Sequence, residues 1–209
     1  MWGQVAIGIG LLVLGTILGV FWTEYLKRPK LRVVGSSGVG REAFLTQALR
    51  IGNRPAFLGI RMGETVIVGR RIGQGFQKGL AIDRNTAKEC TAWLIDRETK
   101  KRVAGLFWHR PDSTGADLSV SIEPGEYAEL WIFARLKDEP LAYFPYRPSD
   151  RNTLDPEVPA AAARIHESRE FMIEVNYSYG QQRLLIPVSV EKQLDGRLRF
   201  AFVEGSSSF

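Results

Sequence analysis

Hydrophobic and polar residues follow two different patterns along this chain of 209 residues. From Trp2 to Trp22 no residue is charged. A helix of this length rises about 31 Å, which matches the hydrocarbon core of a bilayer. Trp2 at one end, and Trp22 with Tyr25 at the other, are placed where aromatic rings prefer the headgroup level. The pattern predicts a transmembrane helix over residues 1–23.

A cleaved signal peptide is the alternative interpretation of this apolar run. Such a peptide needs a basic N-terminal region, an apolar stretch of about 7–15 residues and a cleavage site of small residues. Here no Lys or Arg precedes the apolar run, and the run is longer than that range. The sequence therefore favours an uncleaved anchor.

Basic residues follow the apolar run directly. Lys27, Arg28, Lys30 and Arg32, offset by Glu24, give this segment a net charge of +3. The positive-inside rule then predicts an N-terminus outside and a domain in the cytoplasm. The four basic side chains are candidates for contact with anionic lipid headgroups. The opposite orientation, with an extracytoplasmic domain, stays open because many anchored sandwich domains face outward.

Small residues occur in an ordered way within the predicted membrane helix. At about 100° per residue, Gly8, Gly15 and Gly19 lie on one face. Gly15 and Gly19 form a GxxxG pair, which lets two membrane helices approach closely. The spacing predicts helix packing, with a second copy or with a larger membrane assembly. The alternative is that Gly is simply common in membrane helices.

Beyond the anchor, apolar residues alternate with polar ones in short runs separated by turn residues. The runs that predict strands are 91–95, 103–108, 118–122, 127–136, 141–146, 171–177, 184–190 and 198–203. Pro124-Gly125 and Asp195-Gly196 mark two of the turns. This rhythm predicts an all-β, antiparallel, Ig-like sandwich over residues 43–209. A segment rich in Pro and Asp, 147–165, predicts a long surface connection.

Residues 24–42 are interpreted as a basic juxtamembrane segment and a Gly/Ser tether. Within them, Gly35 to Glu42 has the spacing of a phosphate-binding loop, and Glu42 to Leu49 could be helical. Arg41 and Glu42 stand where that loop needs Lys and Ser or Thr. A carboxylate there would repel phosphates, and no βα alternation follows. The tether is therefore the favoured interpretation.

Charge is distributed unevenly along the chain, whose formal net charge is +5. Residues 41–102 carry a net charge of +7, and residues 103–209 a net charge of −5. A basic face in residues 41–102 would attract anionic lipid or a charged ligand. The basic residues lack an aromatic stacking platform or a recognisable reading motif, so no nucleic-acid partner is expected.

Few residues are suited to metal or redox chemistry. The single cysteine, Cys90, excludes a disulfide framework and a cysteine-based structural zinc site. Cys90, His109, His166 and Met172 could supply the ligand types of a blue-copper site, but both His follow the Cys. We therefore expect Cys90 to pack as a small apolar side chain. No catalytic residue, metal or cofactor is predicted.

A resemblance to a known group of domains rests on two stretches of the chain. Residues 85–94 and the turn at Ile122-Glu123-Pro124-Gly125-Glu126 resemble Ig-like adhesion-type sandwich domains of the CARDB kind. The resemblance covers about residues 80–136 and lacks the Cys–Trp–Cys core of antibody domains. It implies a binding or structural module without catalytic residues.

Bulky rings are concentrated between residues 107 and 146, where core filling and an exposed partner-binding strip are the two interpretations. These rings are Trp108, Trp131, Phe133, Tyr143, Phe144 and Tyr146. Taken together, the patterns predict a single-pass membrane protein with a non-catalytic interaction or scaffold module. An accessory subunit of a membrane assembly is the expected role. A lipid- or ligand-sensing domain is the alternative.

Overall fold

The structure is a computed structural model that divides into two compact units. It describes residues 2–21, 27–40, 43–54, 56–58, 61–62, 65–66, 80–82, 84–110, 115–149, 155–160, 164–178 and 180–202. Unit 1 comprises Met1–Lys30 and Arg54–Asn85, and unit 2 comprises Leu31–Asn53 and Thr86–Phe209.

Unit 1 contains a helix and four short strands. Helix α1 is Trp2–Phe21; β3 (Ala56–Leu58) pairs with β6 (Leu80–Ile82), and β4 (Arg61–Met62) pairs with β5 (Thr65–Val66). Two backbone hydrogen bonds join residues 27–30 to the two ends of the segment Arg54–Asn85. The Asn85 N–H donates to the Lys27 carbonyl at 2.7 Å, and the Arg54 N–H donates to the Lys30 carbonyl at 3.1 Å.

Helix α1 presents apolar side chains in all directions where its side chains are described, from Gly10 to Phe21. Every side chain in this stretch is exposed, including Leu12 at 72%. The polar group of Thr16 is satisfied within the helix, because its hydroxyl donates to the Leu12 carbonyl at 2.9 Å. A search of the described residues finds no helix with both the length and the hydropathy of a membrane span. The span over residues 1–23 therefore stays a prediction.

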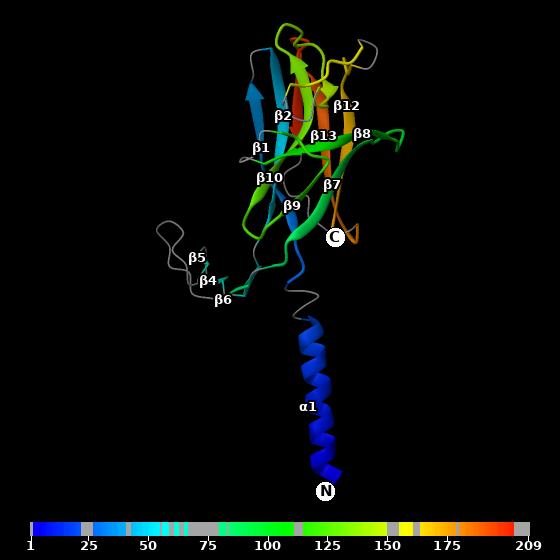
Figure 1. The fold of residues 1–209 in the computed structure, drawn as a ribbon. Helices are drawn as coiled ribbons and strands as arrows, with labels where there is room; N and C mark the ends of the chain where they lie inside the picture. The colour runs from blue at the N-terminus through cyan, green and yellow to red at the C-terminus, as the bar shows by residue number, and fades with distance from the viewer. Residues whose placement is uncertain are drawn as a thin grey trace. The chain divides into compact units, whose positions relative to one another are not determined.

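Unit 2 is mostly antiparallel β, as the sequence predicts for its fold class, and its ten strands form one sheet (Figure 1). Its strands follow the order β1-β2-β10-β8-β7-β12-β13-β14, with β11 beside β10 and β9 beside β7. The strands are β1 (Leu31–Gly40), β2 (Phe44–Asn53), β7 (Ala87–Asp96), β8 (Arg102–His109), β9 (Ser119–Ile122), β10 (Tyr127–Leu136), β11 (Phe144–Pro145), β12 (Arg169–Tyr177), β13 (Gln182–Lys192) and β14 (Leu198–Phe202). Seven of the predicted strand runs coincide with β7 to β10 and β12 to β14.

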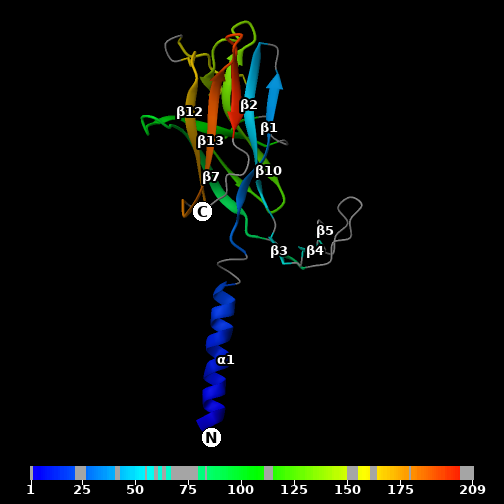
Figure 2. The same cartoon turned by 180° about the vertical axis from the view of Figure 1, so that it is seen from behind.

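Strand β8 joins two halves of this sheet by changing partners along its length. Residues Arg102 to Leu106 pair with β7, whereas Phe107 to His109 pair with β10. We call β1, β2 and β10 the β2 half, and β7, β12, β13 and β14 the β12 half. Strands of each half lie side by side in both views, and β8 passes between the halves (Figures 1 and 2). The sheet therefore curls instead of staying flat.

The inner face of the curled sheet encloses one hydrophobic core. Leu49 and Ile51 from β2 belong to the same buried cluster as Leu94 from β7 and Ile173 from β12. The alternation predicted for β7 is confirmed, since Cys90, Ala92 and Leu94 are buried and the residues between them are half-buried. Both halves of the sheet thus share their buried surface.

A β-bulge in β10 directs an additional ring into this core. The register with β2 shifts between Trp131 and Phe133, so Ile132 and Phe133 both join the inner cluster. The ring of Phe133 lies 5.5 Å from that of Phe171 on β12 and 5.9 Å from that of Phe200 on β14. Phe133 therefore connects the two halves through direct ring contacts.

The structure corrects the interpretation of residues 24–42. Residues 31–40 are not a tether: they form β1, which pairs along its length with β2. Phe44 to Leu49 belong to strand β2, so the helical interpretation of this segment is wrong, while Arg41 and Glu42 lie outside the described residues. The Gly-rich stretch is consequently an extended strand followed by a strand, rather than a loop followed by a helix. The small residues that suggested a tether are accommodated because this strand lies at an edge of the sheet.

Residues 147–165, which are predicted to be a long surface connection, are described at 147–149, 155–160 and 164–165. No strand lies in its described residues, and isolated bridges join Pro148 to Pro156 and Tyr143 to Ile165. The predicted strand over 141–146 is reduced to the two residues of β11. Within unit 2, these bridges hold the described parts of the connection at defined points.

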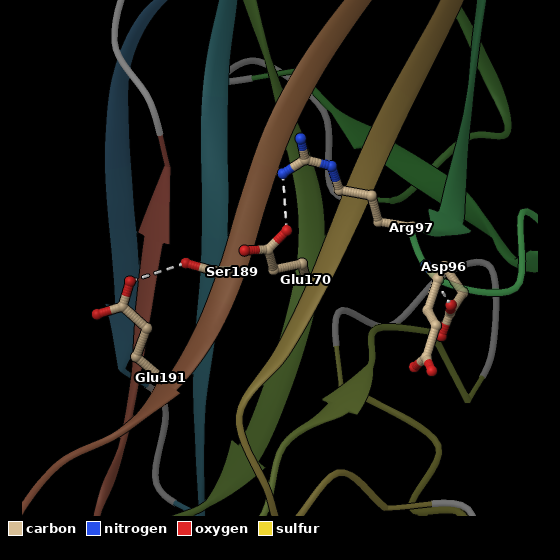
Figure 3. Close-up of polar contacts among 6 residues, drawn as sticks. Asp96, Arg97, Glu170, Ser189 and Glu191 are labelled. Carbon is tan, nitrogen blue, oxygen red and sulfur yellow. Dashed lines mark hydrogen bonds and ion pairs between the residues drawn. The ribbon is translucent and has the colours of Figure 1, made fainter.

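A buried aspartate organises the turn between β7 and β8. One carboxylate oxygen of Asp96 accepts the N–H groups of Glu98 and Thr99 at 3.0 and 2.8 Å. The other oxygen lies 2.5 Å from the guanidinium of Arg169 at the start of β12. The Thr99 N–H, assisted by Arg169, lowers the pKa of Asp96 although burial opposes this effect. Beside it, Arg97 contacts Glu170 at 2.7 Å (Figure 3).

This turn gives a pH-dependent prediction. A carboxylate whose pKa is lowered by folding stabilises the fold above its unfolded pKa of about 3.9. That contribution disappears as the pH falls through the lower, folded pKa. We expect Asp96→Asn to lower the free energy of unfolding by about 1–3 kcal/mol at pH 7, and to flatten the loss of stability on acidification. Urea unfolding at a series of pH values measures both effects.

The matched control is Asp195→Asn at the turn between β13 and β14. Asp195 also accepts a turn N–H, that of Arg197 at 3.0 Å, but its side chain is exposed. We expect this change to alter the free energy of unfolding by less than about 0.5 kcal/mol. Equal effects of the two substitutions would show that the buried Asp96 makes no special contribution.

Candidate functional site

The concentrated aromatic rings are structural. All six are buried, which confirms core filling and excludes an exposed strip made of these residues: Trp108, Trp131, Phe133, Tyr143, Phe144 and Tyr146. Three of them, Trp131, Phe144 and Tyr146, form a second buried cluster apart from the main core, together with Ala48, Ala116 and Ala134. A binding surface in this part of the chain must therefore use other apolar residues, beside this cluster.

An open groove of about 600 Å³ lies beside the second cluster. Its lining comes from β7 and β8, from Leu118 directly before β9, from the segment around β11, and from the 147–165 connection. The lining residues are Trp93, Val103, Ala104, Gly105, Phe107, Leu118, Pro145, Tyr146, Arg147, Glu157 and Pro159. A volume of this size lies within the range of pockets that bind ligands or partner side chains.

The floor of the groove depends on a glycine between two aromatic residues. Gly105 lies two residues before Phe107 along β8. On the neighbouring strand β7, its register partner is Trp93. A Cβ at Gly105 would meet the Trp93 ring at 3.6 Å and Leu118 at 3.9 Å, which are ordinary contacts. The absence of a side chain here leaves a hollow between the rings.

Two aliphatic side chains of the groove face solvent. Val103 is 46% exposed and Leu118 is 54% exposed. The Trp93 ring is held in place by the guanidinium of Arg102, which lies 4.6 Å from the ring centroid and 3.7 Å from Glu174. The result is an open apolar surface built on two paired strands.

The charged groups of the groove wall pair with each other. Arg147 lies 3.4 Å from Glu157, and the Glu157 N–H donates to the Arg147 carbonyl at 2.7 Å. Among the lining residues that the structure describes, no nucleophile faces a general base. The arrangement is suited to binding an apolar group and offers no acid–base machinery at these positions.

The charge asymmetry of the sequence is partly offset by pairing across strands. Arg50, Arg97 and Arg102, from the basic part of the chain, contact Glu129, Glu170 and Glu174, from the acidic part. Glu129 also accepts the Ser37 hydroxyl at 3.2 Å. At these positions the basic residues of 41–102 do not form a separate basic face. The basic face as a lipid or ligand sensor stays a prediction.

The residues considered as copper ligands have different surroundings. Cys90 is buried, its thiol donates to the Ala87 carbonyl at 3.3 Å, and burial raises its pKa to about 12. It packs in the core as predicted. His109 contacts the Gly115 carbonyl at 3.2 Å, and His166 is exposed. Across the described residues, no cluster of three or more His, Cys, Asp or Glu could hold a metal ion.

The residues predicted to pack helices or contact lipid lie in α1, in the segment after it and at the start of β1. Gly8, Gly15 and Gly19 lie within α1, and nothing lies within 4 Å of a Cβ built at Gly15 or Gly19. Lys27, Arg28 and Lys30 are exposed, while Arg32 is half-buried in β1. Helix packing and lipid contact at these residues stay predictions.

Comparison of the chain with protein-family models, with curated proteins and with solved structures finds no match in any of the three. The groove itself was not predicted from the sequence. Its available signal is Gly105 in the interior of an apolar strand, since such a glycine often marks a close approach to another group.

Proposed function

We propose that this chain is a membrane-anchored, non-catalytic interaction module whose groove docks an apolar segment of a partner protein. The observation that carries the proposal is the open apolar groove around Gly105. Isolated exposed apolar residues are common, but an apolar hollow with an aromatic floor and two exposed aliphatic walls favours an interaction site. An accessory role in a membrane assembly follows from combining this site with an anchor.

The anchor is supported by α1 and its sequence. The uncharged run from Trp2 to Trp22 is helical over Trp2–Phe21, and its described side chains are apolar in every direction apart from the satisfied Thr16. A helix that is apolar all round and exposed needs an apolar environment. A cytoplasmic domain is favoured by the basic residues after the span, and protease added to intact cells decides between the two orientations.

The β unit is proposed to be of the Ig-like sandwich type. Support comes from the two halves of the curled sheet, which enclose one core between them. The resemblance to CARDB-like domains is retained within this proposal. It agrees with a binding role and adds no catalytic residue.

Site-specific photo-crosslinking tests the docking site. A photoreactive amino acid at Leu118, inside the groove, should give a discrete crosslink to a partner protein in native membranes. The same amino acid at Leu194, which is fully exposed at the turn between β13 and β14, should give none. Introducing Val103→Glu should abolish the Leu118 crosslink, because it places a charge in the apolar hollow.

Stability measurements make this test interpretable. Val103 is largely exposed, so Val103→Glu should change the free energy of unfolding by less than about 0.5 kcal/mol. Crosslinks of equal yield at Leu118 and Leu194, or a Leu118 crosslink unaffected by Val103→Glu, would exclude the groove as the docking site.

The glycine face of α1 gives a second prediction. Gly15→Leu should weaken association between α1 and its packing partner on the order of tenfold, because the larger side chain separates the helices. Gly10→Leu is the matched control, since Gly10 lies roughly 140° away around the helix. Neither position has an atom within 4 Å of a built Cβ, so both variants should keep the helix. Energy transfer between labelled copies, or recovery of a partner in mild detergent, measures the difference.

If Gly10→Leu and Gly15→Leu have the same effect on both readouts, the glycines are ordinary membrane composition and carry no packing specificity.

A further inference from the structure

One edge of the ten-stranded sheet is long and carries no charge over most of its length. Strand β1 contains ten residues, and among the described strands it pairs on one side only, with β2. From Val33 to Gly40 it contains no charged residue and no proline. Long uncharged edges are unusual, because an unpaired row of N–H and C=O groups is a template for another strand.

The opposite edge of the same sheet is protected. Strand β14 contains five residues and includes Arg199. Short length and an added charge are two of the devices that natural sheets use against strand pairing. In β1 the single charge, Arg32, and the bulge between Val33 and Gly35 both lie near its start, and the register with β2 is regular from Gly35 to Gly40. The two edges therefore differ in their ability to accept a partner.

Small side chains leave the backbone of β1 accessible. Nothing lies within 4 Å of a Cβ built at Gly35 or Gly40, and the nearest atoms at Gly38 are at ordinary contact distance. Because β2 already holds this strand in an extended conformation, the entropic cost of ordering it is largely met before a partner binds. The edge is thus preorganised.

We infer that two copies of this chain pair antiparallel through the Gly35–Gly40 edges of β1. A two-fold axis perpendicular to a sheet keeps both faces in register and sets one residue opposite its own copy. The regular segment Gly35–Gly40 is centred between Ser37 and Gly38. With Ser37 as the residue on the axis, Ser36 lies opposite Gly38 of the other copy. No like charges meet in this arrangement, since the paired segment carries none. The inference depends on neither the groove nor the glycine face of α1.

Disulfide trapping in the full-length protein tests the pairing. Residues directly opposite in antiparallel strands have Cα atoms about 4.5–5.5 Å apart, which suits a disulfide. Ser37→Cys should therefore give a covalent dimer under mild oxidation. Ser119→Cys, an exposed serine on β9, should give none, and the native Cys90 is buried and silent. The dimer should also form with Gly15→Leu and Gly19→Leu present, which separates it from helix packing.

A pair of proline variants shows whether the backbone edge is responsible. Neighbouring N–H groups along a strand point to opposite sides, so Gly35→Pro and Ser36→Pro remove one N–H toward β2 and one toward the outer edge. The variant with the smaller fall in melting temperature identifies the outward N–H. In the Ser37→Cys background, that variant should lose the covalent dimer. Failure of Ser37→Cys to dimerise, or persistence of the dimer in that variant, would overturn the inference.

Discussion

The architecture of unit 2 depends on one strand that hydrogen-bonds to two different neighbours. Four of the first five residues of β8 pair with β7, and its last three pair with β10. A flat sheet of this size would leave one apolar face exposed, because no helix of unit 2 covers it in the described residues. By changing partners, β8 lets the sheet bend so that its two ends bury their apolar faces against each other. The ring contacts of Phe133 with Phe171 and Phe200 follow from that bend.

The same change of partner creates the candidate site on the outer face. Gly105 belongs to the part of β8 that pairs with β7, while Phe107 pairs with Trp131 on β10. The groove therefore spans the point where β8 passes from one half to the other. The missing side chain at Gly105 leaves the hollow at this point. A rigid, fully paired scaffold thus positions an apolar hollow, which is a suitable arrangement for docking.

The sequence predicts most strands from β7 onward well. The alternation that begins at Thr91 and the turns at Gly125 and Gly196 match the strands found there. Both glycines adopt positive φ, 85° and 81°, as such turns require. The prediction from sequence fails at β1 and β2. Small residues such as Gly35 and Ser37 have weak strand preference, so only pairing with β2 makes the segment extended. Helical and extended interpretations of 44–49 also compete, because short apolar runs do not distinguish them.

The candidate site was missed for a related reason. The large aromatic residues, which are conspicuous in the sequence, fill the core. The groove is made by Gly105, Val103 and Leu118, which form no distinctive pattern in the sequence. The bulge at Trp131 adds to the difficulty, because it reverses the inward and outward positions in the second half of β10. Contacts between residues distant in sequence, such as Arg50 with Glu129, likewise cancel a charge asymmetry that is visible along the chain.

Native-state hydrogen exchange tests most directly whether β8 makes the two halves one cooperative structure. Amides of β2, β8 and β12 are to be followed as denaturant is raised. If β8 unites the sheet, the slowest amides in all three strands share one opening free energy, equal to the global free energy of unfolding. A lower opening free energy confined to the β2 half, with its own denaturant dependence, would show that the halves unfold separately and would contradict this account.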